Sequence, residues 1–115
     1  MRVCVPVTPT GQIDRWGRAR QVAVAQVMSG EIVDWQLSNV GWDDLHDAGT
    51  EGAHHARVAR FVREQDVEAV VAEHMGADMA HMLHRLGMTV HLGATGDART
   101  AVLAAARGGL EATQA

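Results

Sequence analysis

The chain has 115 residues, a formal net charge of −4 at pH 7 and one cysteine. A chain of this length forms one domain that buries roughly 65 % of the surface its unfolded form exposes, so folding requires neither a disulfide nor a structural metal. The acidic balance and the scattered basic residues argue against nucleic-acid binding. Because there is no secretory signal and no apolar run near the roughly 18 residues of a membrane span, we expect a cytoplasmic protein that does not contact membranes.

The first half of the chain is predicted to hold three strands, at 3–7, 21–27 and 32–37. Cys4 lies in the first apolar run, so we interpret it as a small buried side chain in a reducing compartment. Ser29-Gly30 turns the second strand into the third, which makes a hairpin. The connection at 41–52 is long and rich in Asp and Gly, and loops of this kind are often functional.

The second half alternates between helices and short strands. Its predicted helices are 53–64, 77–86 and 97–106, and its predicted strands are 67–72 and 88–92. On the first of these helices the apolar stripe runs through His55, Val58, Ala59 and Val62, which places His55 on the side that faces the core. We expect residues 1–106 to form the single domain and residues 107–115 to be a flexible tail.

This order of elements predicts an α/β fold: a mixed five-stranded sheet in which only the second strand is antiparallel, with three helices on its faces. The loops after the first, third, fourth and fifth strands then emerge at one edge of the sheet. Open α/β sheets bind ligands at that edge. The polar residues that we expect to share this crevice are Asp14, Arg15, His46, His54, His55 and His74.

Three histidines are the predicted metal ligands of this crevice. His74 follows a buried strand and precedes Met75-Gly76, where a glycine permits close approach of a ligand. His54 and His55 open a helix, whose positive dipole end disfavours the imidazolium, and neutral imidazole is the form that binds metal. The alternative for each is a hydrogen-bonded structural histidine. His81 and His84 form an i, i+3 pair on a solvated helix face with no third donor in view.

Several segments resemble the dinitrogenase iron-molybdenum cofactor biosynthesis family, the small NifX-like and NifB C-terminal-like domains. They are the opening run 1–7, the segment Arg15-Trp16-Gly17-Arg18-Ala19, the turn 29–33 and the strand 67–72 with the turn after it. The resemblance covers residues 1–106. It implies a ribonuclease-H-like fold and a non-enzymatic protein that binds, stores or passes on iron-molybdenum cofactor or a related metal-sulfur cluster.

Two departures from the family pattern affect the expected crevice. Arg15 stands where the family often has His, and Glu73-His74 replaces a usual glycine pair. The ligand is therefore either a cluster of the iron-molybdenum type or a mononuclear transition metal held by the three histidines. The residues expected to contact the cofactor besides these ligands are Arg15, Trp16, Gly17, His46, Met75 and Gly76.

Two other functions remain open from the sequence. The first is a metal-dependent phosphoester hydrolase or transferase with an acidic site, built from Asp14, Asp43, Asp44 and Asp47. The second is a partner-binding module anchored by Trp16, Trp35 and Trp42. The partners expected for a carrier are cofactor-biosynthesis or cluster-receiving proteins, and the chain is a possible homodimer.

Overall fold

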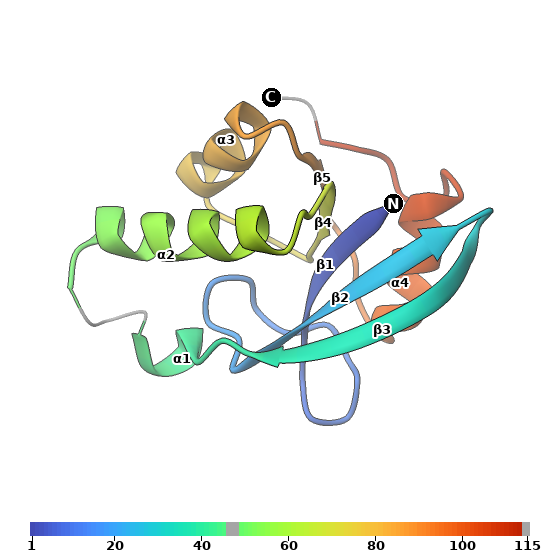
Figure 1. Cartoon of the computed structure of the whole chain (residues 1–115), viewed down its shortest axis with the longest axis horizontal. Coiled ribbons are helices and arrows are strands. Elements are labelled where there is room, and N and C mark those ends of the chain that lie inside the picture. The colour runs from blue at the N-terminus through green and yellow to red at the C-terminus, as the bar shows by residue number, and fades with distance from the viewer. Residues whose placement is uncertain (46–48, 114–115) are drawn as a thin grey trace.

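The computed structural model describes residues 1–45 and 49–113, which form a five-stranded sheet with helices on both faces (Figure 1). The strands are β1 Arg2–Val7, β2 Gln21–Met28, β3 Glu31–Asn39, β4 Ala69–Val71 and β5 Thr89–His91. The helices are α1 Trp42–Leu45, α2 Glu51–Glu64, α3 Ala77–Arg85 and α4 Ala98–Ala106. The prediction of an α/β fold is therefore confirmed.

The strand order across the sheet is β3-β2-β1-β4-β5. Strand β2 runs antiparallel to both of its neighbours, and β4 pairs in parallel with β1 and with β5. The expected mixed sheet with a single reversed strand is therefore present. Strand β1 is central: Val3 is in register with Ala25 on one side and with Ala69 on the other. Because a central strand is buried on both faces, its sequence is a continuous apolar run, as it is in residues 3–7.

The described residues form four helices, whereas the sequence predicted three, so the predicted number was wrong. The additional helix, α1, lies within the segment that was expected to be an irregular loop. It is a single turn whose first residue, Trp42, is 1 % exposed. The ring of Trp42 packs edge-to-face on Trp16 and on Phe61, with ring centroids 5.3 and 5.8 Å away. A buried aromatic anchor thus holds a turn that has no helical periodicity of its own.

Helix α2 differs from its prediction in its start and in the face that it buries. It begins at Glu51, where the Thr50 side chain accepts a hydrogen bond from the Ala53 N–H and so caps the first turn. The side chains buried by this helix are His54, Val58 and Val62, whereas His55 is only partly buried. The expectation that His55 faces the core was wrong. By helical spacing, Val58 and Val62 can share a buried face with either His54 or His55. Because Phe61 packs on Trp42 of α1, the helix is rotated so that His54 is the histidine on the buried face.

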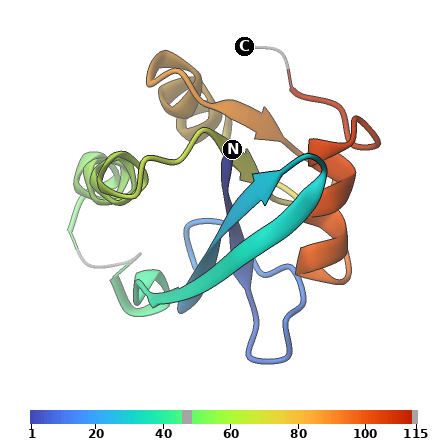
Figure 2. The same ribbon diagram turned by 45° about the vertical axis from the view of Figure 1, so that its right-hand side comes forward.

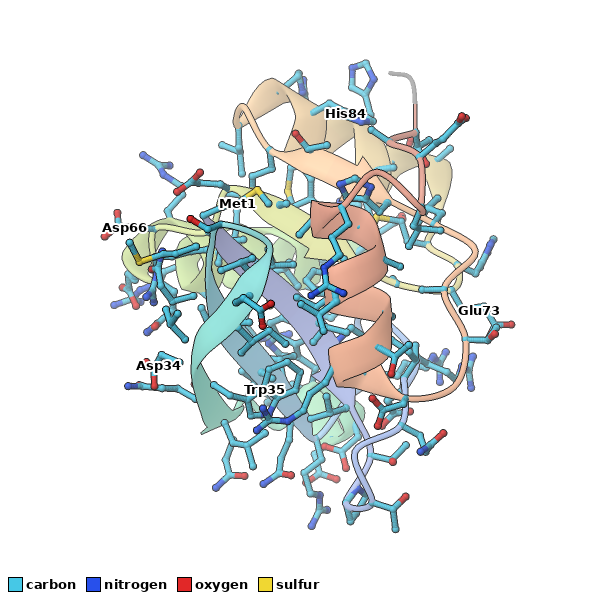
Figure 3. All side chains as sticks on the ribbon, turned by 90° about the vertical axis from the view of Figure 1, so that its right-hand side faces the viewer. Met1, Asp34, Trp35, Asp66, Glu73 and His84 are labelled. Carbon is cyan, nitrogen blue, oxygen red and sulfur yellow. The ribbon has the colours of Figure 1, made fainter. Side chains whose placement is uncertain are left out.

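The sheet separates two hydrophobic clusters. On one face, α1, α2 and α3 cover a cluster that contains Trp16, Trp42, Leu83 and several methionines. Helix α4 lies on the other face (Figure 2). It covers a cluster of valines and alanines, against which Trp35 packs. Figure 3 labels Trp35 on β3 beside α4, and the Arg99 guanidinium lies 4.5 Å from the centroid of its ring. The core is therefore two layers of different composition.

Residues 107–113, which the sequence suggested as part of a flexible tail, contact the α3 and β5 region. The Thr113 N–H donates to the Val90 carbonyl at 2.6 Å. His91 Nδ1 lies 2.8 Å from the Leu110 carbonyl oxygen, and His84 Nε2 lies 3.0 Å from that of Thr113. These two imidazoles hold the end of the described chain. Among the helices of the described residues, none has the length and apolar character to cross a membrane.

Candidate functional site

Three loops meet at the edge of the sheet where β1, β4 and β5 end. The Ile13 N–H donates to the Gly96 carbonyl at 2.8 Å, which joins the loop after β1 to the loop after β5. The Gly93 N–H donates to the Glu73 carbonyl at 2.8 Å, which joins the loops after β5 and β4. Backbone hydrogen bonds thus fix these loops to one another, and side chains distant in sequence reach one edge, as the parallel topology predicts.

A first cleft of about 410 Å³ opens at this edge between the loop after β1 and the loop after β4. This volume is within the range of roughly 300–1,000 Å³ that is typical of small-ligand sites. Its lining residues are Ile13, Asp14, Arg15, Trp16, Arg18, Glu73, His74, Met75 and Gly76. Charged side chains of both signs therefore stand around an apolar floor made by an indole and a thioether.

A second cleft of about 300 Å³ adjoins the first, between α2 and the start of α3. Its lining residues are Trp16, Gly17, Glu51, His54, His55, Met75, Gly76, Ala77, Asp78 and Met79. Trp16, Met75 and Gly76 line both clefts, so they form the wall that the two share. We call this trio the shared wall.

The three predicted metal ligands are distributed over the two clefts. His74 is exposed and lines the first, whereas His54 and His55 line the second. In the described part of the chain, no three His, Cys, Asp or Glu side chains are grouped closely enough to hold one metal ion. The structure therefore brings the imidazoles to neighbouring clefts without assembling a finished three-histidine site.

His54 has an environment unlike that of the other two. It is 6 % exposed, and its Nδ1 lies 3.3 Å from the Arg57 guanidinium. Its Nε2 lies against Gly17, where a Cβ would be only 3.1 Å away. Gly17 also has φ +82°, a conformation that side chains disfavour, so a glycine is required there for backbone and packing reasons alike. The His54 side chain therefore fills the contact between α2, to which it belongs, and the loop after β1.

The remaining histidines occupy less enclosed positions or other regions. His55 Nε2 lies 3.8 Å from a carboxylate oxygen of Glu51, one turn earlier on α2. His81 is exposed on α3, and His84 and His91 contact the end of the chain as described above. His46, which was predicted to contact the cofactor, lies outside the described residues.

Gly76 has no structural reason to be a glycine. Its backbone has φ −62° and ψ 150°, which any residue adopts, and a Cβ built there meets nothing within 4 Å. The missing side chain instead leaves open space at the shared wall. Gly76 is also the N-cap of α3 and has no side chain to accept from the first-turn N–H groups. The start of α3 therefore presents backbone donors at the wall.

Trp16 carries an unsatisfied donor. Its side chain is 8 % exposed, and its Nε1–H is the one fully buried side-chain polar atom without a hydrogen-bond partner among the described residues. An unpaired buried donor costs about 1–3 kcal/mol of stability, so such groups are rare away from functional sites. The sequence indicated Trp16 through the family segment and as a possible anchor for a partner, but not as an unpaired donor, because an unpaired donor leaves no mark on a sequence pattern.

Cys4 is unsuited to hold a metal or cluster in the folded protein. It is fully buried in the middle of β1, and burial raises the pKa of its thiol to about 12. Thiolate is the form that binds metals, and this thiol stays protonated at neutral pH. Because the chain has no other cysteine, the ligand donors available from one chain include imidazoles, carboxylates, methionine thioethers and backbone groups, but no accessible thiolate.

The three described carboxylates of the alternative acidic site do not gather in one place. Asp43 and Asp44 are on α1, where Arg20 lies 3.0 and 3.8 Å from their oxygens. The hydrogen bond from Arg20 lowers the pKa of Asp43. Asp14 lines the first cleft, where it accepts from the Arg15 N–H at 2.7 Å, and Asp47 lies outside the described residues. This arrangement gives the hydrolase alternative no support.

Several lining residues were missed by the sequence analysis. Arg18 belongs to the segment that resembles the family and Glu73 is a departure from the family pattern, but neither was predicted to contact the ligand; both line the first cleft. Glu51 and Asp78 line the second cleft and were not singled out at all. Their position next to predicted site residues, in segments 15–18, 73–78 and 51–55, was the available signal.

Comparison with known proteins agrees with this architecture. Residues 1–108 match the family model described as dinitrogenase iron-molybdenum cofactor, so the chain belongs to that family. No curated protein matches the chain. Three similar solved structures, each sharing at most 21 % sequence identity with the chain, show that the fold is shared.

One of these structures is the apo form of the orange protein from Desulfovibrio gigas, with TM-score 0.79, 16 % identity and coverage of 97 % of this chain and 92 % of that one. The protein PH0822 gives TM-score 0.75 at 19 % identity, covering 98 % and 96 %. A Thermotoga protein suggested to be a NifB protein gives TM-score 0.71 at 21 % identity, covering 96 % and 91 %.

Proposed function

We propose that this protein binds and carries a metal or metal-sulfur cluster of the iron-molybdenum cofactor kind, as cargo and without catalysing a reaction on it. The observation that supports this most directly is the pair of adjoining clefts at the edge where β1, β4 and β5 end. Membership of the iron-molybdenum cofactor family supports it independently. The ribonuclease-H-like description of the sheet belongs to the same proposal.

The chemistry of the clefts fits a ligand held without cysteine. Among the described residues, the imidazoles that line the two clefts are those of His54, His55 and His74. Imidazole suits iron, zinc, copper and nickel. Arg15 and Arg18 stand at the first cleft and balance negative charge on a cluster. In this proposal Gly17, Met75 and Gly76 supply close approach and apolar surface, as the sequence predicted.

A carrier needs a source and a recipient. We propose that the protein exchanges its cargo in the cytoplasm with cofactor-biosynthesis or cluster-receiving proteins. The clefts open to the surface at one edge of the sheet, so a cargo there remains reachable by a second protein.

Anaerobic loading tests the proposal. Protein purified without an affinity tag is treated separately with iron plus sulfide, molybdate, zinc and copper(I), desalted, and analysed for metal per chain. We expect one of these treatments to leave a stoichiometric amount bound. Protein that stays metal-free after all four contradicts the proposal.

A matched pair of glycine variants locates the cargo. In Gly76→Leu, a side chain enters open space at the shared wall, so the fold is retained while retention of the bound metal falls at least about tenfold. Gly52→Leu places the same side chain on the first turn of α2, outside both clefts, and is the control. Equal loss of metal in both variants would argue against the clefts as the binding site.

A further inference from the structure

The shared wall indicates what kind of atom the cargo presents to the protein. Trp16 lies at the position where both clefts meet, and its indole N–H is buried without a partner. An indole nitrogen is a donor only: it does not coordinate a metal cation, and it pairs with an acceptor such as an oxide, a sulfide or a carbonyl. A bare metal ion would leave this donor unsatisfied.

The start of α3 provides further donors at the same wall. Gly76 caps this nine-residue helix without a side-chain hydrogen bond, and it lines both clefts. The first N–H groups of a helix have no partner within the helix and are typical binding groups for negatively polarised ligands. The indole and the helix start are independent features, and both present hydrogen-bond donors to one place.

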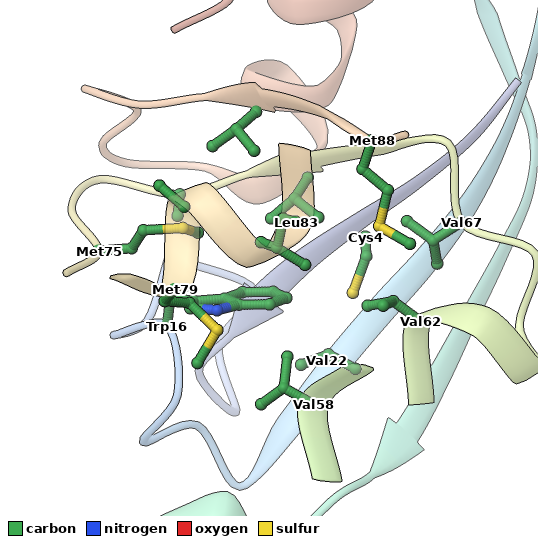
Figure 4. Close-up of a cluster of buried hydrophobic side chains, with 14 of the residues drawn as sticks. Cys4, Trp16, Val22, Val58, Val62, Val67, Met75, Met79, Leu83 and Met88 are labelled. Carbon is green, nitrogen blue, oxygen red and sulfur yellow. The ribbon is translucent and has the colours of Figure 1, made fainter. Parts of the chain in front are cut away.

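The covering of the indole is adaptable. Figure 4 shows Trp16, Met75 and Met79 together at one end of the buried cluster, away from Cys4, Val67 and Met88. Methionine has three rotatable bonds and changes rotamer at little cost, so a ligand at the wall can displace a thioether and reach the indole. Trp16 itself is held from behind by its edge-to-face contact with Trp42. The donor therefore stays in place while its cover moves.

We propose that the cargo bears an oxo or sulfido group that accepts a hydrogen bond from Trp16 Nε1 at the shared wall, assisted by the start of α3. This deepens the proposed carrier function and rests on it. Trp16 is then the residue that separates metal-oxo and metal-sulfido species from bare cations. The first cleft is lined by Arg15 and Arg18 as well as by two carboxylates, whereas the second cleft has the carboxylates Glu51 and Asp78 and no arginine. The acceptor therefore faces the first cleft.

The test compares two probes on three proteins. Tetrathiomolybdate carries sulfido acceptors, and Zn²⁺ carries none. Binding of each is measured by titration to the wild-type chain, Trp16→Phe and Trp35→Phe, with the fold of each variant checked by circular dichroism. We expect Trp16→Phe to weaken tetrathiomolybdate binding about tenfold, the value of one such hydrogen bond, and to leave Zn²⁺ binding unchanged. Trp35→Phe, from the hydrophobic cluster on the other face of the sheet and outside both clefts, should change neither.

A measurement on the wild-type chain keeps the inference testable if Trp16→Phe does not fold. With ¹⁵N-labelled indoles, the Trp16 N–H resonance should shift downfield on adding tetrathiomolybdate, while those of Trp35 and Trp42 stay in place. Unchanged affinity in a folded Trp16→Phe, or an unmoved Trp16 resonance in the loaded wild type, overturns the inference but leaves the carrier function intact. A wild-type chain that binds neither probe, and no metal in the loading experiment, overturns both.

Discussion

The two faces of the sheet are packed with different kinds of side chain. The face under α4 is filled by valines and alanines, which leave little freedom to rearrange. The face under α1, α2 and α3 contains two tryptophans, a leucine and three buried methionines, and the clefts open beside it. The difference indicates that one face is a rigid support for β1 and β4, whereas the other can adjust around a ligand.

The largest effect is expected from emptying the face that adjoins the clefts. Leu83 on α3 is fully buried in that cluster. Leu83→Ala removes three carbon atoms and leaves a cavity, so the free energy of unfolding should fall by about 2–5 kcal/mol. Urea denaturation followed by circular dichroism measures it. A fall in the free energy of unfolding at or below the low end of that range would mean that the methionines move into the cavity. That result would support the view that this face can adjust.

The next effect comes from overfilling the opposite face. Ala23 on β2 is fully buried among valines and alanines. Ala23→Leu adds volume where neighbouring side chains have few alternative rotamers, so we expect a loss of about 1–3 kcal/mol in the same denaturation experiment. A variant as stable as the wild type would show that this face can also rearrange to accommodate added volume, which would contradict the proposed difference between the faces.

A smaller effect is expected from reshaping the adjustable face without changing its volume. Met79→Leu exchanges side chains of similar size near Trp16, so the free energy of unfolding should fall by less than about 1.5 kcal/mol. Thermal unfolding compared with Ala23→Leu gives the contrast directly. A loss larger than that of Ala23→Leu would contradict the proposed difference in packing.

The smallest effect concerns alkaline pH. Burial raises the pKa of Cys4 from 9.0 to about 12, so the folded state keeps its proton while the unfolded state loses it. Stability is then fully present below pH 9 and falls as the pH rises from 9 toward 12, by about 1 kcal/mol at pH 10. The chain has no Tyr, and all ten of its Lys and Arg residues are Arg, so few other groups titrate in this window.

Urea denaturation at pH 8 and pH 10 measures this change. Cys4→Ala is the control and should lose most of the pH dependence. A wild-type chain whose stability is the same at both pH values would show that the thiol is reachable by solvent, against its position in the sealed middle of β1.

The sequence anticipated the sheet better than the site. The apolar runs at 3–7, 21–27 and 67–72 and the turn at Ser29-Gly30 are local signals, and they led to the mixed sheet with one reversed strand. The family segment at 15–19 pointed to the loop that lines both clefts. What could not be anticipated was the division of the three histidines between two clefts, because it depends on where Trp16 and Met75 pack.

The two features that the sequence did not predict, helix α1 and the burial of His54 instead of His55, have the same origin. The single turn of α1 exists because Trp42 packs between Trp16 and Phe61, which are 26 residues and 19 residues away along the chain. The rotation that buries His54 instead of His55 also follows from that contact, since the hydrophobic spacing on α2 permits either. Local periodicity does not contain long-range aromatic packing.

By itself the sequence determined the order of the strands and of the three longer helices, the edge of the sheet where the loops gather and the burial of its cysteine, because hydrophobic periodicity and turn residues are encoded locally. Only the tertiary structure decided which imidazole enters the core, how the histidines are divided between the two clefts, and that an indole N–H lies unpaired at the shared wall. Those features arise where segments distant in the chain meet, and the geometry of such a meeting is fixed by packing.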